Sequence, residues 1–360
     1  MNKIKLAVLF GGNSSEYEVS LKSAYSVLTN LDPEKYEVIP VGITRDGLWT
    51  LYTGDLEEIP DGRWCADVDS LARITVDLTP GARSFWVLQP GDSAMQRLAV
   101  DVVFPVLHGA FGEDGRLQGM LSSAAIPFVG CGSASSAVCM DKALTKCVVR
   151  TTGIRQAECL VVLRREAVGR EEKIAEQAEE KLGYPVFVKP ARAGSSVGVT
   201  KAKNRAQLLD ALKIAFAEDE KVLIEEAIVG REIEVAVLEE GDHCTVSDCA
   251  EIVAGVEFYD YEAKYISDTS SFYIPARLPE ELRAQVSRCA ETIFRALDCR
   301  TLSRVDFFVE EDGGIVFNEI NTLPGFTSIS MYPKLMMHKG MSYSVLLDRL
   351  IASALGKTSE

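Results

Sequence analysis

The chain has 360 residues, too many for one ordinary hydrophobic core, and this length predicts two or three domains. Hydrophobic residues make up 47% and charged residues 25%, which is the composition of a soluble globular protein. The net charge of −15 argues against nucleic acid or an anionic membrane as the main partner, because phosphate contacts need clustered Lys and Arg.

Cysteine and histidine usage argues against a disulfide framework and against a zinc site. The nine cysteines include no Cys-x-x-Cys pair, and the three histidines lie far apart. The first apolar run, residues 6–10, is too short for a signal peptide, and no later run approaches transmembrane length. We therefore expect a cytoplasmic protein without a membrane partner.

The N-terminus predicts a strand over residues 4–10, a Gly-Gly-Asn turn and a helix that ends near Leu31. Ser15 and Glu18 have the spacing of a capping box at the start of this helix. Glu16 is left without a capping role, and its simplest function is to favour the positive end of the helix. The turn lacks the G-x-G-x-x-G spacing of a dinucleotide site.

A second glycine-rich loop follows the apolar run 100–107, which is typical of a strand covered on both faces. The loop reads HGAFGEDG and begins at His108. Its glycines permit positive φ angles and close backbone approach, so the loop is suited to hold one shape. A single histidine at a strand end is as often structural as functional. Ligands in such sheets bind beyond the carboxyl ends of the strands, where this loop should lie.

The middle of the chain predicts helices over residues 133–149, 171–182 and 204–217, with strands over 186–189 and 222–226. The first strand leads into PARAGSSVG, residues 190–198. Such a small, polar loop can donate several N–H groups to phosphate oxygens, although a plain hairpin turn is the alternative. It is not a Walker A sequence, because no Gly-Lys-Ser/Thr opens a helix.

Two later stretches are ambiguous by themselves. The acidic run Glu225, Glu226, Glu232 and Glu234 would be assigned to a solvated strand face. The aromatic segment FYDYEAKY, residues 258–265, lies in a long polar region without clear periodicity. Long loops of this kind are usually functional, and mobile loops that close over ligands exclude water.

Residues 301–330 predict a β-hairpin with its turn at Glu311-Asp-Gly-Gly314. If the turn is centred between Asp312 and Gly313, Asp306 lies opposite Glu319 and Arg304 lies opposite Asn321. Two opposed carboxylates repel each other, and a divalent cation would remove that repulsion. Two carboxylates and an amide oxygen suit Mg²⁺. The alternative is a solvated hairpin face with incidental charges.

Seven stretches, in order, carry a resemblance that covers the whole chain: GGNSSE, HGAFGEDG, MDK, VKPARAGSSVG, EFYDYEAKY, SRVDFF and FNEINTLPGFTS. Together they resemble the D-alanine–D-alanine ligase family of the ATP-grasp superfamily. The resemblance implies an α/β fold with three domains of the ATP-grasp type. These are an N-terminal Rossmann-like parallel sheet (1–130), a central domain (131–224) and a C-terminal domain with the metal site and a lid loop (225–360).

The resemblance also implies the chemistry. It implies ATP-dependent joining of two D-alanine molecules through an acyl phosphate, for peptidoglycan precursor synthesis, by a homodimer. The implied cofactors are ATP and Mg²⁺, with two metal ions and with Mn²⁺ able to substitute. The implied metal ligands are Asp306, Glu319 and Asn321.

Individual roles are carried over by the same resemblance. Glu16, Ser195 and the lid residue Tyr265 would bind the first D-alanine. Ser330, with a backbone donor near Met331, would hold the carboxylate of the second. Arg304 and the Gly325 N–H would stabilise the oxyanion, and His108 belongs to the same substrate site. The nucleotide would contact Lys142, Lys189, Ser195, Ser196, Glu225, Ala227, Ile228, Glu232, Lys264 and Asn318.

Three alternatives stay open or are weakened by the sequence. No histidine occurs between residues 244 and 337, which argues against the lid of ligases that add D-lactate. Ligases that add D-serine in glycopeptide resistance resemble this chain at VFPVLHG and CMDK, although Ala250 stands where some of them have Asp. A nucleotide-binding module without catalysis would be expected to have lost some of the charged residues that are present here.

Overall fold

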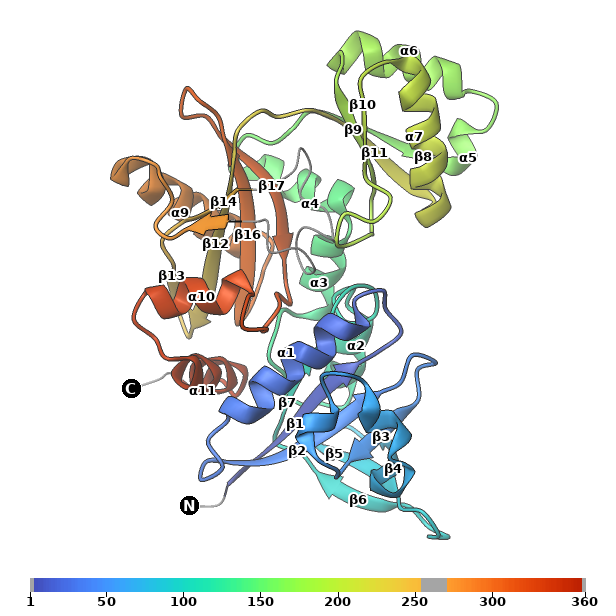
Figure 1. Ribbon diagram of the computed structural model, residues 1–360, viewed down its shortest axis with the longest axis vertical. Coiled ribbons are helices and arrows are strands. Elements are labelled where there is room, and N and C mark those ends of the chain that lie inside the picture. Colours follow the sequence, from blue (N-terminus) through green and yellow to red (C-terminus); the bar gives the residue numbers. More distant parts are fainter. Residues whose placement is uncertain (1–2, 254–270, 358–360) are drawn as a thin grey trace.

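The structure is a computed structural model that describes residues 3–253 and 271–357. Its described part contains three β-sheets, one after another along the chain (Figure 1). The predicted α/β class is confirmed. No helix in the described ranges is both long and apolar enough to cross a membrane.

The first sheet has the strand order β6-β5-β4-β3-β2-β1-β7. Strand β1, next to the edge strand β7, pairs in parallel with β2 and β7, and the remaining pairs are antiparallel. The sheet is therefore mixed, where a parallel sheet was predicted. The strands are β1 (Ile4–Gly11), β2 (Tyr36–Ile43), β3 (Trp49–Tyr52), β4 (Leu71–Val76), β5 (Ser84–Leu88), β6 (Gln96–Ala99) and β7 (Val102–Val106).

Helix α1 (Tyr17–Asn30) follows β1, as predicted, but the capping box is wrong. Glu16 occupies the N-cap position without a side-chain cap bond, and Glu18 forms an ion pair with Arg45 instead. The Glu16 carboxylate does not cap the helix and instead accepts a hydrogen bond from Ser195. Helix α2 (Arg116–Ser123) follows the HGAFGEDG loop, and three short 3₁₀ helices lie between β3 and β4: η1 (Leu56–Glu58), η2 (Arg63–Ala66) and η3 (Val68–Ser70).

The second sheet has the order β10-β9-β11-β8 and its own hydrophobic core. It lies at the opposite end of the molecule from the first sheet (Figure 1). Its strands are β8 (Cys159–Leu163), β9 (Val186–Pro190), β10 (Thr200–Ala202) and β11 (Lys221–Glu226). Its helices are α5 (Arg164–Ala167), α6 (Glu171–Leu182) and α7 (Arg205–Glu218), the last two close to the predicted ranges.

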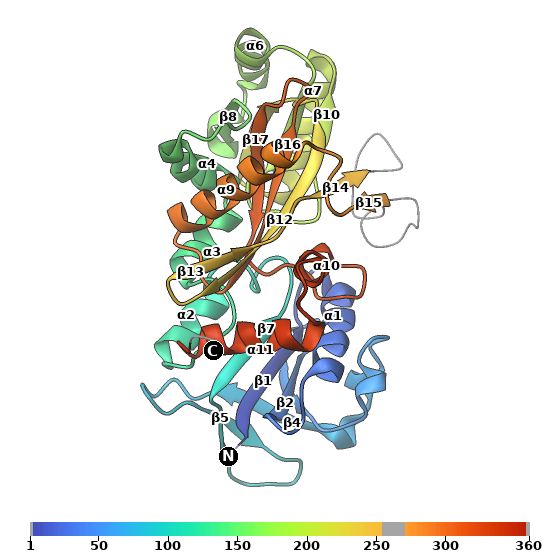
Figure 2. The same ribbon diagram turned by 90° about the vertical axis from the view of Figure 1, so that its left-hand side faces the viewer.

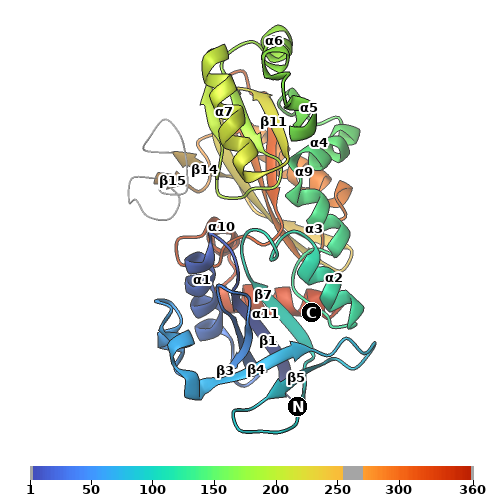
Figure 3. The same ribbon diagram turned by 90° about the vertical axis from the view of Figure 1, so that its right-hand side faces the viewer.

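The helix predicted over residues 133–149 is two helices, α3 (Ser133–Met140) and α4 (Lys142–Val149), and the 3₁₀ helix η4 (Arg150–Thr152) follows. Asp141 separates them with an extended backbone, and its carboxylate accepts hydrogen bonds from the N–H groups of Ala143 and Leu144. The break is thus an N-cap. Figure 3 shows α2, α3 and α4 following one another along one side of the molecule.

The third sheet has the order β15-β14-β12-β16-β17, and β13 pairs with the far end of β12. Helix α9 (Glu280–Ala296) packs on one face of this sheet, and α10 (Met331–His338) and α11 (Tyr343–Ala354) pack on the other. The strands are β12 (Arg231–Glu240), β13 (His243–Val246), β14 (Ala250–Val253), β15 (Ser271–Tyr273), β16 (Leu302–Val309) and β17 (Ile315–Asn321).

One hydrophobic cluster joins the first and third sheets. Leu347 of α11 and Tyr332 of α10 belong to the same buried cluster as Val8 and Phe104 of the first sheet. Figure 2 shows α10 and α11 between the two sheets, beside α1. The C-terminal helices therefore fasten the third sheet to the N-terminal part of the chain.

Candidate active site

Strands β16 and β17 form the predicted hairpin, with a turn whose centre differs from the prediction. Val309 pairs with Ile315, which centres the turn on Asp312 and not between Asp312 and Gly313. With this turn and a regular ladder, every pair farther along the hairpin would be displaced by one residue, and the side chains of one strand would change face.

A β-bulge at Asn318 restores the predicted pairing. The register changes between Asp306 and Phe307, so that Asp306 lies opposite Glu319 and Arg304 lies opposite Asn321. Bulges place one extra residue in one strand and redirect side chains. The predicted pairing of the charged residues is therefore confirmed. It results from the bulge and not from the turn on which the prediction was based.

Arg304 and Asp306 form a double hydrogen bond on one face of β16. The Nε and Nη2 groups of Arg304 donate to the two oxygens of Asp306 at 2.8 and 2.7 Å. The Oε2 atom of Glu234, on the neighbouring strand β12, lies 3.4 Å from the same Nε atom. Lys142 lies 3.6 Å from Glu319. The carboxylates are thus held by two cations of the chain.

A small cavity of about 120 Å³ between the first and third sheets is bordered by Lys142, Glu234, Arg304 and Glu319. The predicted residues that line it are Glu16, Lys142, Ser195, Arg304, Asn318, Glu319, Asn321, Gly325, Ser330 and Met331. Asp306 is reached through Arg304 and is not part of the lining.

Glu16 and Ser195 meet at this cavity although 179 residues separate them. The Ser195 hydroxyl donates to Glu16 Oε1 at 2.5 Å. Ser195 and Ser196 both have positive φ angles, 49° and 59°, a strained conformation that is frequent at functional sites. The loop over residues 190–198 therefore reaches from the second sheet to the first helix.

Glu113, in the HGAFGEDG loop, is a lining residue without a predicted role. Its Oε1 atom accepts a hydrogen bond from the Gly109 N–H at 2.7 Å. Burial, with Glu16 nearby, raises the pKa of Glu113 to about 8. A side chain at Gly109 would collide with Ser14 at 2.7 Å, so this close approach requires glycine. Glu113 thus brings a carboxyl group that is neutral over much of the pH range.

His108 does not line the cavity, contrary to the expectation that it binds substrate directly. Its Nδ1 atom is 3.2 Å from the carbonyl oxygen of Leu323, and its Nε2 atom is 3.4 Å from the Ser23 hydroxyl. Burial lowers its pKa and favours the neutral ring. Both ring nitrogens face structural groups, so His108 joins the glycine-rich loop to the segment that follows β17.

That segment closes one side of the cavity. The Ser330 hydroxyl accepts a hydrogen bond from the Thr327 N–H at 3.0 Å and shares a second one with the Thr327 hydroxyl at 2.8 Å. Ser330 also occupies the N-cap position of α10 without bonding to the helix. A Cβ atom at Gly325 would lie 2.6 Å from the Ser330 hydroxyl, so the tight turn needs glycine here.

A larger cavity of about 680 Å³ lies between the second and third sheets. Its volume is in the range of ligand pockets. The predicted residues that line it are Lys142, Lys189, Ser195, Ser196, Glu225, Ala227, Ile228, Glu232 and Asn318. The predicted residues Lys264 and Tyr265 lie outside the described residues.

Glu225 is buried between two lysines in this cavity. Lys189 lies 2.7 Å from one of its oxygens and Lys146 lies 3.0 Å from the other. Burial works against the charged form, but the two lysines outweigh it and lower the pKa of Glu225. For Lys189, burial is likewise outweighed by Glu225, and its pKa is raised. The ion pairs therefore keep both groups charged inside the cavity.

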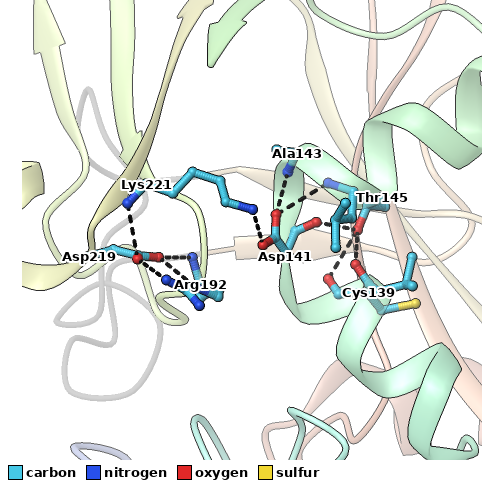
Figure 4. A network of polar contacts seen from close by, with 9 residues as sticks. Cys139, Asp141, Ala143, Thr145, Arg192, Asp219 and Lys221 are labelled. Atoms are coloured by element: carbon cyan, nitrogen blue, oxygen red, sulfur yellow. Dashed lines mark hydrogen bonds and ion pairs between the residues drawn. The ribbon is translucent and has the colours of Figure 1, made fainter. Parts of the chain in front are cut away.

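A network of ion pairs and hydrogen bonds joins Asp141, the N-cap of α4, to Lys221, Asp219 and Arg192 (Figure 4). Asp141 caps α4 and accepts a hydrogen bond from Lys221 Nζ at 2.5 Å. Asp219 in turn accepts hydrogen bonds from Arg192, in the loop over residues 190–198, and from the Lys221 N–H. Lys142 begins α4 and donates to the carbonyl oxygen of Ala193 at 2.9 Å. The helix and the loop are thus held together.

The two cavities meet. The residues that border both are Lys142, Ala193, Ser195, Phe317, Asn318 and Glu319. A ligand in the larger cavity and a ligand in the smaller one can therefore contact each other between a lysine, a serine and a carboxylate.

The bordering residues that sequence reasoning missed include Lys146, Glu113 and Glu234. Lys146 lies one helical turn after Lys142 on the same helix, and this spacing could have indicated it. Glu113 is inside a quoted motif, but its pKa depends on burial. Glu234 was grouped with solvated acids, and only its pairing with Asp306 in the sheet reveals its place.

The donor set fits Mg²⁺ if a nucleotide completes it. Within the described ranges, no three Asp, Glu, His or Cys side chains gather closely enough to hold a metal alone. Magnesium at nucleotide sites is bound by one or two carboxylates and by phosphate oxygens. Asp306 and Glu319, opposed in the hairpin, with Asn321 beside them, supply such a partial set.

Comparisons with known proteins agree with this arrangement. The family model described as D-ala D-ala ligase N-terminus matches residues 5–131, and the D-ala D-ala ligase C-terminus model matches residues 148–352. A D-alanine–D-alanine ligase of Caldicellulosiruptor bescii is 48% identical over 361 residues, covering 100% of this chain and 97% of that protein. One of Acetivibrio thermocellus is 47% identical, covering 100% and 98%.

Solved structures confirm the fold. The VanG D-Ala:D-Ser ligase from Enterococcus faecalis has a TM-score of 0.89 and 43% identity, with 98% of this chain and 100% of that chain covered. The D-alanine–D-alanine ligase from Coxiella burnetii has a TM-score of 0.85 and 33% identity, with 99% and 95% covered. With the predicted ATP-grasp fold thus confirmed and both family models matched, the chain belongs to the D-alanine–D-alanine ligase family.

Proposed function

We propose that the protein joins two D-alanine molecules to D-alanyl-D-alanine with hydrolysis of ATP to ADP and phosphate. The observation that carries this proposal is the junction of the two cavities at Lys142, Ser195 and Glu319. A nucleotide in the larger cavity would place its terminal phosphate at this junction, next to an amino acid in the smaller one. The full-length similarity to D-alanine–D-alanine ligases supports the same reaction.

The first step activates a carboxylate. An oxygen of the first D-alanine carboxylate attacks the γ-phosphorus of ATP, the bond to the β-phosphate oxygen breaks, and an acyl phosphate and ADP result. Glu16 would bind the ammonium of this D-alanine, and Ser195 would orient Glu16. Lys142 and Lys189 would neutralise phosphate charge, with the Ser196 N–H beside them.

The second step forms the peptide bond. The amine of the second D-alanine attacks the acyl carbon, loses a proton, and inorganic phosphate leaves. Ser330 would bind the carboxylate of this substrate, with the N–H of Met331 at the start of α10. Arg304 and the Gly325 N–H would stabilise the tetrahedral oxyanion.

Metal and nucleotide contacts complete the proposal. Mg²⁺, held by Asp306, Glu319 and Asn321, would offset negative charge on the transferred phosphate, and we infer two ions with Mn²⁺ as a substitute. The adenine and ribose would contact the remaining residues of the larger cavity: Glu225, Ala227, Ile228, Glu232 and Asn318. Lys264 would contact the nucleotide, and the lid residue Tyr265 would bind the first D-alanine together with Glu16 and Ser195.

We further infer the biological setting: a cytoplasmic homodimer that supplies the dipeptide for peptidoglycan synthesis. The three sheets support three domains, with proposed ranges 1–130, 131–224 and 225–360. Residues 131–149 join the second and third of these, because Cys139 and Val149 pack in the core of the third sheet.

A second candidate is D-alanine–D-serine ligation. It is favoured by the similarity to the Enterococcus faecalis D-Ala:D-Ser ligase. The two products differ only in the second substrate, so the fold and the phosphoryl-transfer residues do not distinguish them.

The test is ADP release measured with D-alanine alone and then with D-serine or D-lactate added, with products identified by mass spectrometry. We expect ADP release that depends on D-alanine, with D-alanyl-D-alanine as the main product. Mainly D-alanyl-D-serine would support the second candidate. An absence of turnover with every D-amino acid would overturn both and favour a nucleotide-binding module.

A further inference from the structure

Glu234 lies in a row of three carboxylates that crosses three adjacent strands. It is directly opposite Asp306 in the β12–β16 pair, and Asp306 is directly opposite Glu319 in the β16–β17 pair. Like charges in opposed positions of a sheet destabilise it. The side chain of Glu234 is only 10% exposed, so burial adds to that cost. A buried acid in this position needs a cation partner.

One cation close to Glu234 is Arg304, whose side chain is 14% exposed. Its single Nε–H donates a hydrogen bond to Asp306 at 2.8 Å, while Glu234 Oε2 lies 3.4 Å from the same nitrogen. A shift of about 0.5 Å would bring Glu234 to ordinary hydrogen-bond distance. The Arg304 guanidinium therefore has two carboxylates within reach, those of Asp306 and Glu234. Its Nε–H is hydrogen-bonded to Asp306 and not to Glu234.

The proposed function creates a conflict at Asp306. Both of its oxygens accept hydrogen bonds from Arg304, yet it is also a proposed metal ligand. A cation at an Asp306 oxygen draws on the same negative charge and weakens the hydrogen bond of that oxygen with the guanidinium. A second carboxylate within reach of Arg304 would then stabilise the buried guanidinium.

We propose that Glu234 is a positioning residue that takes over the Arg304 guanidinium when Asp306 binds the metal. This inference rests on the proposed function. Arg304 then stays on the wall of the small cavity, which Gly325 and Ser330 also line and where the oxyanion would form. Glu234 is not a third metal ligand, because no three acidic side chains gather around one point in the described part of the chain.

The test is Mn²⁺ binding to the protein–ADP complex, followed by electron paramagnetic resonance, for wild type, Glu234→Gln and Glu234→Asp. We expect Glu234→Gln to weaken Mn²⁺ binding by about tenfold, because the displaced Arg304 loses a charged partner. Glu234→Asp keeps the carboxylate and should recover part of the loss. It also keeps the test valid if the Gln variant does not fold.

Glu239→Gln is the matched control. Glu239 lies on the same strand, has a side chain that is 13% exposed, and forms an ion pair with an arginine, Arg300, at 3.0 Å. It borders neither cavity. We expect Mn²⁺ binding of this variant to stay within twofold of wild type.

A double-mutant cycle separates the positioning role from direct ligation. If Glu234 acts through Arg304, adding Glu234→Gln to Arg304→Ala should change Mn²⁺ binding far less than in wild type. An equal loss in both backgrounds would make Glu234 a metal ligand and overturn the proposal. Unchanged Mn²⁺ binding in Glu234→Gln would overturn it as well. Because this readout needs no D-alanine, its failure is distinct from failure of the proposed reaction.

Discussion

At the scale of single residues, the site concentrates buried charge that is balanced in pairs. Asp306 is balanced by Arg304, Glu319 by Lys142, and Glu225 by two lysines. Breaking such a pair on one side leaves an uncompensated charge, which costs more than the pair contributes. Substitutions here therefore need readouts of both activity and folding.

The first prediction concerns Arg304→Ala. We expect turnover to fall about 10²–10³-fold, as when one oxyanion donor is removed, because Arg304 borders the small cavity. The affinity for ADP should stay near wild type, since Arg304 does not line the larger cavity. Steady-state kinetics and calorimetric titration with ADP measure the two effects. Arg300→Ala, whose arginine is paired outside both cavities, is the control, and near-wild-type turnover in Arg304→Ala would contradict the assignment.

The second prediction concerns the buried carboxyl of Glu113. Its folded-state pKa is raised to about 8 from an ordinary value of 4.5, first by burial and then by Glu16. Between these two values the unfolded chain binds fewer protons than the folded chain, so stability falls as pH rises. Its contribution is fully present below about 4.5 and is lost as pH rises through about 8.

Glu113→Gln removes this titration. We expect the stability of the Gln variant relative to wild type to increase from pH 5 to pH 8, by at most about 1.4 kcal/mol per pH unit, and then to level off. Urea unfolding at several pH values measures it. A difference between the two proteins that stays constant from pH 5 to pH 9 would show that Glu113 is not held neutral in the folded state.

The role of a residue could be predicted from the sequence where the residue belongs to a motif. It could not be predicted where the role depends only on burial. The loop over residues 190–198 and the hairpin carboxylates belong to recognisable sequence motifs. Glu234 has no local feature that distinguishes it from the exposed acids nearby, because its role arises from a partner 72 residues later in the chain. His108 was expected at the substrate, but its two ring nitrogens bind the scaffold.

At the scale of elements, the break at Asp141 shows how a cap positions a functional side chain. The sequence predicted one helix over residues 133–149, with Met140-Asp141-Lys142 inside it. A tertiary partner, Lys221 of β11, and the cap bonds favour the interruption. Lys142 is consequently the first residue of a new helix, at the junction of the two cavities.

The third prediction is that Asp141→Ala destabilises the protein by about 1–2 kcal/mol, through loss of the cap. It should also weaken ADP binding, because α4 carries Lys142. The control is Asn204→Ala, which removes the N-cap of α7 on the outer side of the second sheet. We expect a similar loss of stability there without a change in ADP affinity. Equal ADP affinities of the two variants would contradict a role of the Asp141 cap in the site.

The hairpin shows the limit of register prediction. The turn residues and the alternation of side chains predicted the pairing of Asp306 with Glu319, and the pairing is correct. The turn itself is centred on Asp312 and not between Asp312 and Gly313, and the extra residue at the Asn318 bulge restores the predicted pairing. Bulges follow from the packing of the whole sheet, so a sequence read one strand at a time does not contain them.

At the scale of the whole molecule, the two cavities lie between units that are joined very differently. The first and third sheets share one hydrophobic cluster, and Asp348 of α11 accepts hydrogen bonds from Tyr36 and Lys35 of the N-terminal part. The second sheet has a core of its own. The small cavity is thus bordered largely by one cooperative body, whereas the larger cavity lies where a separate unit meets it.

The last prediction uses this difference in cohesion. Leu347→Ala removes a fully buried side chain from the shared cluster, and Leu212→Ala removes one from the core of the second sheet. Each should cost about 2–5 kcal/mol locally. Hydrogen exchange followed by mass spectrometry should show faster exchange in both α11 and β1 for Leu347→Ala, with β9 and β11 unchanged. Leu212→Ala should give the reverse. If Leu347→Ala speeds exchange only in α10 and α11, the first and third sheets are not one body.

If the prediction holds, ADP should slow exchange in the second sheet most, because a ligand bound between two units stabilises the weaker contact.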